Sequence, residues 1–194
     1  SIRNKISLFC NVKPDCVISN TTVDCLYKAP MMLHENGLDT VACRELGIKE
    51  KLDLTPWIEL VKNIDARKGK VVIAMVGKYV SLHDSYLSVV ESLNHASYSN
   101  RVFVDIMWVD SEEITDENVA EKLKGADGIL VPGGFGSRGV EGMIIACRYA
   151  RENDIPYLGI CLGMQVSVME FARNVAGIQN ATSGEFGDGN KVID

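Results

Sequence analysis

Apolar and polar positions follow two alternating patterns in the later part of the chain. From Lys70 onward, short continuous apolar runs rich in β-branched residues are separated by longer stretches that mix apolar and polar residues. The first pattern is typical of strands buried on both faces of a parallel sheet, and the second accommodates amphipathic helices. The pattern predicts strands at residues 71–76, 102–109, 128–131 and 156–160. It predicts helices at residues 84–96, 116–124, 139–153 and 162–176.

Strands and helices that take turns along a chain are typical of a doubly wound α/β domain. In such a domain, crossover helices connect parallel strands, and ligands bind at the loops that follow the carboxyl ends of the strands. Those loops are therefore the first place to look for chemistry.

The chain before Lys70 is organised differently. Residues 5–12 form a short apolar run that suits a buried strand, and Pro30 and Gly37 bracket a short helix. The charged stretch that follows has only isolated apolar anchors, and it suits a linker that contains one amphipathic turn or helix. We therefore expect a first domain, a linker and a second domain at residues 1–45, 46–70 and 71–194.

Composition and charge exclude several classes of function. The formal charge is −6, and the Lys and Arg residues are scattered rather than gathered in a stripe, so we expect no nucleic-acid partner. No run approaches the roughly 18 apolar residues of a bilayer span, and no secretory leader opens the chain. The six cysteines form no C-x-x-C pair and no metal-like spacing with the three histidines. We expect reduced thiols, no membrane partner, no metal site in this chain and a cytoplasmic location.

The sharpest motif is Gly159-Ile160-Cys161-Leu162-Gly163, between a predicted strand and a predicted helix. It has the G-x-nucleophile-x-G form of a nucleophile elbow. Such a tight turn strains the backbone of the nucleophile and leaves no room for neighbouring side chains, so glycines flank it. The N-terminus of the following helix favours a thiolate at Cys161, and the Leu162 N–H can stabilise an oxyanion. The alternative is a buried cysteine on a tight turn without chemistry.

A second glycine loop, Pro132-Gly133-Gly134-Phe135-Gly136, follows the strand predicted just before the elbow strand. Paired glycines can present backbone N–H groups to the same substrate carbonyl that a nucleophile attacks. A simple turn would also explain this loop. Two such loops after successive strands of one sheet nevertheless favour a catalytic Cys161.

The remaining parts of a catalytic site are not apparent. A thiol nucleophile needs a base, but His34, His83 and His95 all precede the elbow, and none ends a predicted strand, so we expect surface or packing roles for them. No G-x-x-x-x-G-K-[ST] phosphate loop is present, so this chain does not bind ATP in that way. An acidic run suits a solvated helix start and is assigned no chemistry: Asp110, Glu112, Glu113, Asp116 and Glu117.

These motifs together resemble the class I glutamine amidotransferases and, within them, the CTP synthase family. The elbow continues as Met164-Gln165, and Arg138-Gly139-Val140-Glu141-Gly142 follows the glycine loop. Further segments resemble the CTP synthase family in the same order along the chain: residues 5–12, Val23-Asp24, Tyr27-Lys28, Pro30, Val76-Gly77-Lys78-Tyr79 and Ser183-Gly184-Glu185-Phe186. The resemblance covers essentially the whole chain. It implies the C-terminal part of a synthetase domain followed by a partial amidotransferase domain.

The resemblance implies an ATP-dependent C–N ligase of pyrimidine biosynthesis. The family joins ammonia from L-glutamine to UTP, with ATP, Mg²⁺ and the effector GTP, as a cytoplasmic homotetramer. By position, Cys161 would form a thioester with glutamine, and the N–H groups of Gly134 and Leu162 would stabilise the oxyanion. Lys5 would contact UTP or CTP, and Val23 in segment 21–23 would contact ATP. The residues that would contact glutamine are Leu162, Gly163, Met164, Gln165 and Glu185.

The resemblance also implies that this chain is a segment of something longer and catalytically incomplete. The family's phosphate loop and metal ligands would precede Ser1, and its His-Pro-Glu motif, which completes the triad, would follow Asp194. Two alternatives remain. A cysteine hydrolase that takes its histidine directly after the nucleophile is disfavoured because Leu162 stands there. A non-catalytic module that binds glutamine or nucleotide would leave Cys161 inert.

Overall fold

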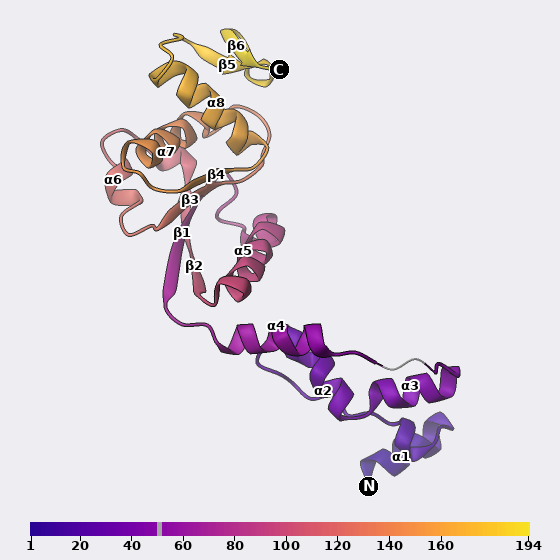
Figure 1. Ribbon diagram of the computed structural model, residues 1–194. Helices are drawn as coiled ribbons and strands as arrows, with labels where there is room; N and C mark the ends of the chain where they lie inside the picture. The colour runs from indigo at the N-terminus through magenta and orange to yellow at the C-terminus, as the bar shows by residue number, and fades with distance from the viewer. Residues whose placement is uncertain (50–51) are drawn as a thin grey trace. The chain divides into compact units, whose positions relative to one another are not determined.

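The computed structural model describes residues 1–49 and 52–194. It consists of two compact units, Ser1–Ala66 and Arg67–Asp194 (Figure 1). The assignment of the chain to a synthetase domain, a linker and an amidotransferase domain stays a prediction, and residues 50 and 51 of the expected linker lie outside the described residues. None of the helices in the described parts of the chain combines the length and the apolar character that a bilayer span requires.

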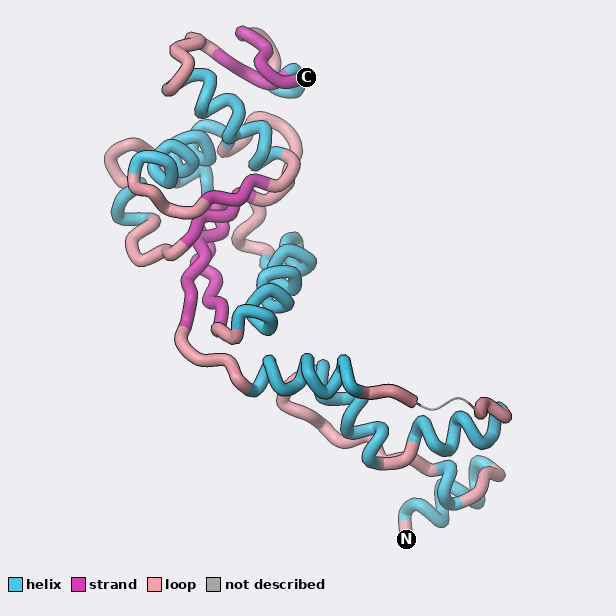
Figure 2. Tube along the Cα trace, viewed as in Figure 1, coloured by secondary structure: helices cyan, strands magenta, loops and turns pink. Residues whose placement is uncertain are grey.

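A four-stranded parallel sheet forms the centre of the unit Arg67–Asp194. In the order β2-β1-β3-β4, its strands are β2 (Phe103–Asp110), β1 (Lys70–Gly77), β3 (Gly128–Val131) and β4 (Tyr157–Gly159) (Figures 1 and 2). The register places Ala74 of β1 opposite Met107 of β2 and Ile129 of β3. Because all four strands are parallel, the loops after β1, β3 and β4 all leave from the carboxyl ends of the strands, on the same side of the sheet. The predicted α/β fold with a parallel sheet is confirmed.

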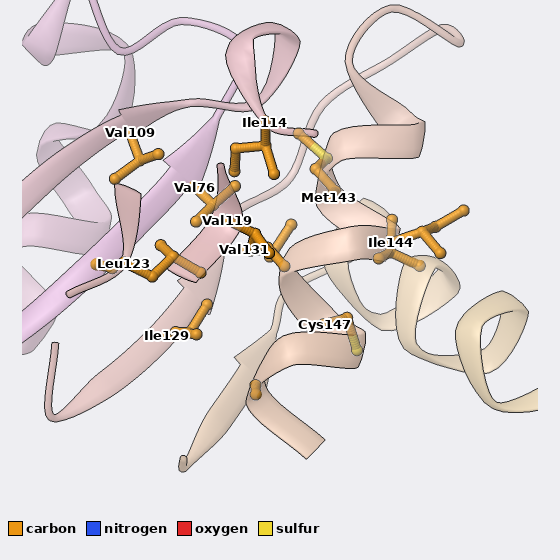
Figure 3. Packing of buried hydrophobic residues seen from close by; sticks show 14 of the residues in the cluster. Val76, Val109, Ile114, Val119, Leu123, Ile129, Val131, Met143, Ile144 and Cys147 are labelled. Atoms are coloured by element: carbon orange, nitrogen blue, oxygen red, sulfur yellow. The ribbon is translucent and has the colours of Figure 1, made fainter. Parts of the chain in front are cut away.

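Apolar side chains of the central strands alternate between the two faces of this sheet, as the period of a strand requires. Ala74 and Val76 of β1 belong to the main core cluster, whereas Met75 and its neighbour Leu130 on β3 belong to a second, smaller cluster. Figure 3 shows the main cluster, in which valines and isoleucines of the strands meet Met143 and the helices that follow. Burial on both faces explains why these strands were predictable as continuous apolar runs.

Helices cover both faces of the sheet, which makes the unit doubly wound as predicted. Their bounds are η3 (His83–Tyr86), α5 (Leu87–Asn100), η4 (Ser111–Glu113), α6 (Val119–Lys122), α7 (Val140–Glu152) and α8 (Leu162–Asn174). α6 is shorter than the helix predicted at 116–124. The Asn118 side chain explains its late start, because it accepts a hydrogen bond from the Thr115 N–H at 2.9 Å and holds residues 115–118 in a turn.

A small parallel pair of strands ends the chain, and the apolar pattern did not predict it. β5 (Ala181–Ser183) pairs with β6 (Asn190–Ile193), and the 3₁₀ turn η5 (Gly184–Phe186) lies between them. The strands are too short and too polar to show a period of two. Both strands pack against α8, and Val192 of β6 also packs against the main core cluster.

The first helix corrects a sequence prediction. Residues 5–12 were expected to form a strand, but α1 (Ile2–Cys10) is helical. Ser1 caps it by accepting a hydrogen bond from the Asn4 N–H, and Asn11 ends it in a left-handed conformation with φ 51°. A short apolar run fits either structure, and these end caps favour the helix.

The rest of the unit Ser1–Ala66 is helical and sparsely packed. It contains η1 (Pro14–Cys16), η2 (Leu26–Lys28), α2 (Ala29–Glu35), α3 (Leu38–Leu46) and α4 (Thr55–Asp65). The helices predicted after Pro30 and in the linker are therefore present. α4 is held by the Trp57 Nε1–H, which donates to the Tyr27 carbonyl at 2.7 Å, and by an ion pair of Asp65 with Lys28 at 2.7 Å. Among the described residues of this unit, only Ser7 and Ile64 are buried.

Candidate active site

Cys161 occupies a strained turn between β4 and α8. Its backbone has φ 53° and ψ −102°, a conformation that non-glycine residues adopt only when their surroundings impose it. Such strain costs on the order of 1–3 kcal/mol and is concentrated at functional sites. The residue is exposed, and it occupies the N-cap position of α8 without a capping hydrogen bond from its side chain. The predicted nucleophile elbow is therefore present in its backbone geometry.

The two glycines of the elbow are required by close approach of backbone atoms. A methyl group on Gly159 would lie 2.3 Å from the carbonyl of Gly163, and one on Gly163 would lie 2.1 Å from the carbonyl oxygen of Val131. The turn is further fixed because the Tyr157 hydroxyl donates to the Gly163 carbonyl at 2.8 Å. The elbow is thus locked to β3 and β4, and Cys161 has a fixed position.

The second glycine loop lies directly beside the nucleophile. A methyl group on Gly133 would lie 3.6 Å from Cβ of Cys161, and one on Gly134 would lie 3.3 Å from Cδ2 of Leu162. Both loops border one pocket of about 490 Å³. It is lined by Tyr79, Ser85, Tyr86, Val89, Pro132, Gly133, Gly134, Phe135 and Cys161. The structure therefore brings together the two motifs that the sequence placed on separate strands.

A buried lysine holds the far end of this glycine loop. The Nζ of Lys78 donates to the Phe135 carbonyl at 2.9 Å and to the Gly136 carbonyl. Burial lowers the pKa of Lys78, and the nearby Arg138 lowers it further, whereas the charges of Glu185 and Glu112 oppose the shift. The site therefore contains a lysine whose charged form is less favoured than in water.

The acidic run after β2 is mostly exposed and opens the 3₁₀ turn η4, as the sequence interpretation expected, and two of its residues also form surface ion pairs. Glu112 forms an ion pair with Arg138, the arginine that follows the glycine loop, and Asp116 forms one with Arg148 of α7. Asp110 accepts a hydrogen bond from the Glu112 N–H at 2.9 Å. Part of the run therefore fastens the segment after the glycine loop to the end of β2.

Gln165 and Glu185, two of the predicted glutamine-binding residues, lie within contact of each other. The Gln165 Nε2 donates to the Glu185 carboxylate at 3.2 Å, and Glu185 is exposed on η5. The other side-chain oxygen, Oε1 of Gln165, is buried without a hydrogen-bond partner among the described residues. A buried acceptor without a partner is costly, so this oxygen suits an incoming N–H donor.

The other predicted binding residues have less informative positions. Leu162 and Gly163 are buried in the first turn of α8, and Met164 is exposed there. As the first residue of α8, Leu162 has an N–H with no acceptor inside the helix, as its predicted role requires. Lys5 is exposed on α1, and Val23 lies half-buried in the loop before η2.

The histidines do not supply a base to Cys161. His83 stacks on Trp108 with ring centroids 4.1 Å apart, His34 pairs with Asp39 at 2.7 Å, and none of the three lines the pocket of Cys161. Within residues 1–49 and 52–194, no three His, Cys, Asp or Glu side chains are grouped so that they could hold a metal ion. The described residues therefore provide a nucleophile and its loop, but not a complete triad.

Lys78, Tyr79 and Tyr86 are site residues to which sequence reasoning gave no role. The segment Val76-Gly77-Lys78-Tyr79 contributed only to the resemblance. A usable signal was present, since Lys78 directly follows β1, whose carboxyl end lies next to that of β3. A lysine at that place in a parallel sheet can reach the loop after the neighbouring strand.

Comparison with known proteins identifies two families along the chain. The family model for glutamine amidotransferase class-I matches residues 81–194, and the model for the CTP synthase N-terminus matches residues 1–48. The chain is 54% identical over 185 residues to a CTP synthase of Clostridium acetobutylicum, with 95% of this chain and 35% of that protein covered. It is 52% identical over 185 residues to a CTP synthase of Halalkalibacterium halodurans, again with 95% and 35% covered.

A solved structure agrees with these matches. The glutaminase domain of Trypanosoma brucei CTPS, with bound acivicin, aligns with a TM-score of 0.55 and 49% sequence identity over 59% of this chain and 45% of that chain. The chain spans 35% of the length of the first curated relatives it matches, about a third. The resemblance to CTP synthase inferred from the sequence is confirmed, and the chain belongs to the glutamine amidotransferase class-I family.

Proposed function

We propose that this chain supplies the glutamine-hydrolysing nucleophile of a CTP synthase. The Cys161 sulfur would attack the side-chain carboxamide carbon of L-glutamine, so that a C–S bond forms and the C–N bond breaks. The nitrogen leaves with a proton as ammonia, and water then hydrolyses the thioester to glutamate and the free thiol. The observation that carries this proposal is the strained backbone of Cys161 beside the Gly133-Gly134 loop.

Backbone N–H groups are proposed to stabilise the intermediate. Charge develops on the amide oxygen as sulfur attacks, and the N–H groups of Gly134 and Leu162 would donate to it. Leu162, Gly163, Met164 and Gln165 would line the glutamine site. Glu185 would hold the α-ammonium group of glutamine, and the unpartnered Oε1 of Gln165 nearby could accept a further N–H.

The whole protein is proposed to be an ATP-dependent ligase that adds this ammonia to UTP. Support comes from the match to the CTP synthase N-terminus and from relatives named CTP synthase. Lys5 would contact UTP or CTP and Val23 would contact ATP, with GTP as effector and a cytoplasmic homotetramer as the assembly. Mg²⁺ would serve the ATP reaction, but the described residues contain no group of ligands that fits it, and no step here depends on it.

Covalent labelling tests the proposal. The full-length gene product is treated with a glutamine-like chloroketone, and the labelled peptide is mapped by mass spectrometry beside the Cys161→Ala variant. We expect one label per chain at Cys161, none in the variant, and loss of glutamine hydrolysis by more than about 10³-fold in the variant. Cys147, which is buried in the same unit, serves as the internal control.

The outcomes separate the candidate functions. Labelling with hydrolysis supports the proposed enzyme. Saturable glutamine binding with an unlabelled Cys161 would instead support a non-catalytic binding module. Hydrolysis that survives in Cys161→Ala would show that another residue is the nucleophile.

A further inference from the structure

Lys78 makes the most unusual polar contacts in the unit Arg67–Asp194. Its side chain is only 4% exposed, although it carries an ammonium group, and both of its acceptors are neutral main-chain carbonyls, those of Phe135 and Gly136. Burying an ammonium group is costly unless hydrogen bonds replace its water. These two bonds connect the end of β1 with the loop that passes beside Cys161.

The loop has few other means of fixing its shape. Gly133, Gly134 and Gly136 have no side chains to pack, and although Pro132 is buried at the start of the loop, Phe135 between the glycines is 81% exposed. The aliphatic stem of Lys78 lies under this loop, because a methyl group on Gly134 would be 3.8 Å from both Cδ and Cε of the lysine. The lysine therefore contacts the loop with its stem and its ammonium group.

Lys78 is itself held rigidly. The N–H groups of Lys78 and Tyr79 both donate to the Tyr86 hydroxyl, at 3.1 and 3.2 Å, and Arg138 donates to the Lys78 carbonyl at 3.3 Å. Tyr86 is buried, and a methyl group on Gly77 would lie 2.7 Å from its hydroxyl oxygen. A rigid anchor is what a catalytic loop needs, since misplacement by about 1 Å can cost on the order of 10²-fold in rate.

We propose that Lys78 is a positioning residue for the oxyanion loop: its ammonium group clamps the carbonyls of Phe135 and Gly136 and so fixes the Gly134 backbone beside Cys161. This inference rests on the proposed glutamine hydrolysis at Cys161. The oxyanion that the Gly134 N–H would stabilise develops only in the transition state. The clamp therefore affects the reaction more than it affects substrate binding.

The test compares two reactions of Cys161 in the full-length gene product. Glutamine hydrolysis passes through an oxyanion, whereas alkylation by iodoacetamide is a direct displacement that needs no oxyanion donor. Lys78→Met keeps most of the stem and removes the donors, and Lys78→Gln keeps one amide donor on a shorter stem. Lys70→Met is the matched control, because Lys70 begins the strand that Lys78 directly follows, but Lys70 is exposed and paired with Asp105.

We expect Lys78→Met to lower kcat for glutamine hydrolysis by about 30-fold or more, since loss of an oxyanion donor costs on the order of 10²–10³-fold. KM and the rate of Cys161 alkylation should stay within about 3-fold of wild type. Lys78→Gln should give the same pattern to a smaller degree, and Lys70→Met should match wild type. Hydrogen exchange should rise at residues 134–137 in Lys78→Met and stay unchanged in β3.

Each other outcome decides against a specific claim. A kcat in Lys78→Met within 3-fold of wild type refutes the clamp. If glutamine hydrolysis and Cys161 alkylation fall in parallel, Lys78 serves the fold and the clamp is refuted. The same holds if β3 loses protection from hydrogen exchange in both Lys78→Met and Lys78→Gln. Wild-type protein that does not hydrolyse glutamine refutes the proposed function instead, whatever the variants do.

Discussion

The two units of the chain are built on different constraints. Arg67–Asp194 has a sheet with core clusters on both faces, and side chains such as Met143 and Leu162 are almost wholly enclosed. Ser1–Ala66 buries only Ser7 and Ile64 among its described residues, and Phe9 of α1 is 87% exposed. Close packing can impose strained backbone, whereas end caps and surface ion pairs cannot. Cys161 therefore lies in the unit that can hold its unfavourable conformation.

The two units should differ most in the loss of stability that a glycine-to-alanine substitution causes. Gly163→Ala would bring a methyl group within 2.1 Å of the Val131 carbonyl oxygen, a collision with main chain that no side-chain movement relieves. We expect a loss of more than about 3 kcal/mol in the free energy of unfolding. Gly47→Ala in the other unit meets no atom within 4 Å and adds only the strain of φ 67°, which costs about 1 kcal/mol.

Urea unfolding followed by tryptophan fluorescence checks this pair. In a polypeptide of residues 1–194, the two tryptophans are Trp57 in one unit and Trp108 in the other, so Trp57→Phe leaves a probe of Arg67–Asp194 alone. In that background, Gly163→Ala should lower the transition midpoint strongly and Gly47→Ala should leave it unchanged. Equal shifts in the two variants would mean that the units unfold together and that the contrast between them is wrong.

Truncation of apolar side chains should give the next largest difference. Met143 on α7 is 1% exposed within the main core cluster, so Met143→Ala leaves a cavity and should cost about 2–3 kcal/mol. Phe9→Ala removes a side chain that already contacts water and should change stability by less than about 0.5 kcal/mol. Thermal melts of the two variants, followed by circular dichroism, measure both. A large loss of stability in Phe9→Ala would mean that Phe9 packs against other residues, and it would contradict the contrast between the two units.

The sequence predicted the fold well where one local pattern was sufficient. The strands β1 and β3 are continuous apolar runs bounded by glycine, and their positions agree closely with the prediction. The pattern failed at α1, where capping residues outside the apolar run decide the structure. It also missed β5 and β6, which are short and depend on contacts with α8.

In the candidate site, too, the residues of a local motif were predictable and those defined by distant contacts were not. Cys161 and its glycines were predictable because the elbow needs its residue types at consecutive positions. Lys78 was not assigned a role, because its partners are carbonyls 57 and 58 residues further along the chain, and a lysine is ordinarily an exposed residue. Contacts of that kind depend on strand order, which a single sequence specifies only weakly.

The smallest expected difference concerns thiol reactivity and its pH dependence. Burial raises the pKa of the Cys147 thiol from its ordinary value of 9.0 to about 11, and the charge of Glu170 adds to the shift. A raised thiol pKa favours the neutral form, so below pH 9 the reactive thiolate of Cys147 is about 100-fold scarcer than that of an ordinary cysteine. Cys10, at the end of α1, is exposed.

Iodoacetamide labelling at pH 8, quantified by peptide mass spectrometry at early times, should therefore modify Cys10 at least about 100-fold faster than Cys147. The rate at Cys147 should rise about tenfold per pH unit and continue to rise to about pH 11, as the thiolate fraction does. Labelling in 6 M urea is the control, because both thiols are then exposed and should react at similar rates. Comparable native rates would show that α7 opens on the timescale of labelling. The tight packing that distinguishes the unit around Cys161 would then be transient, and the elbow would lose the rigid support on which its strain depends.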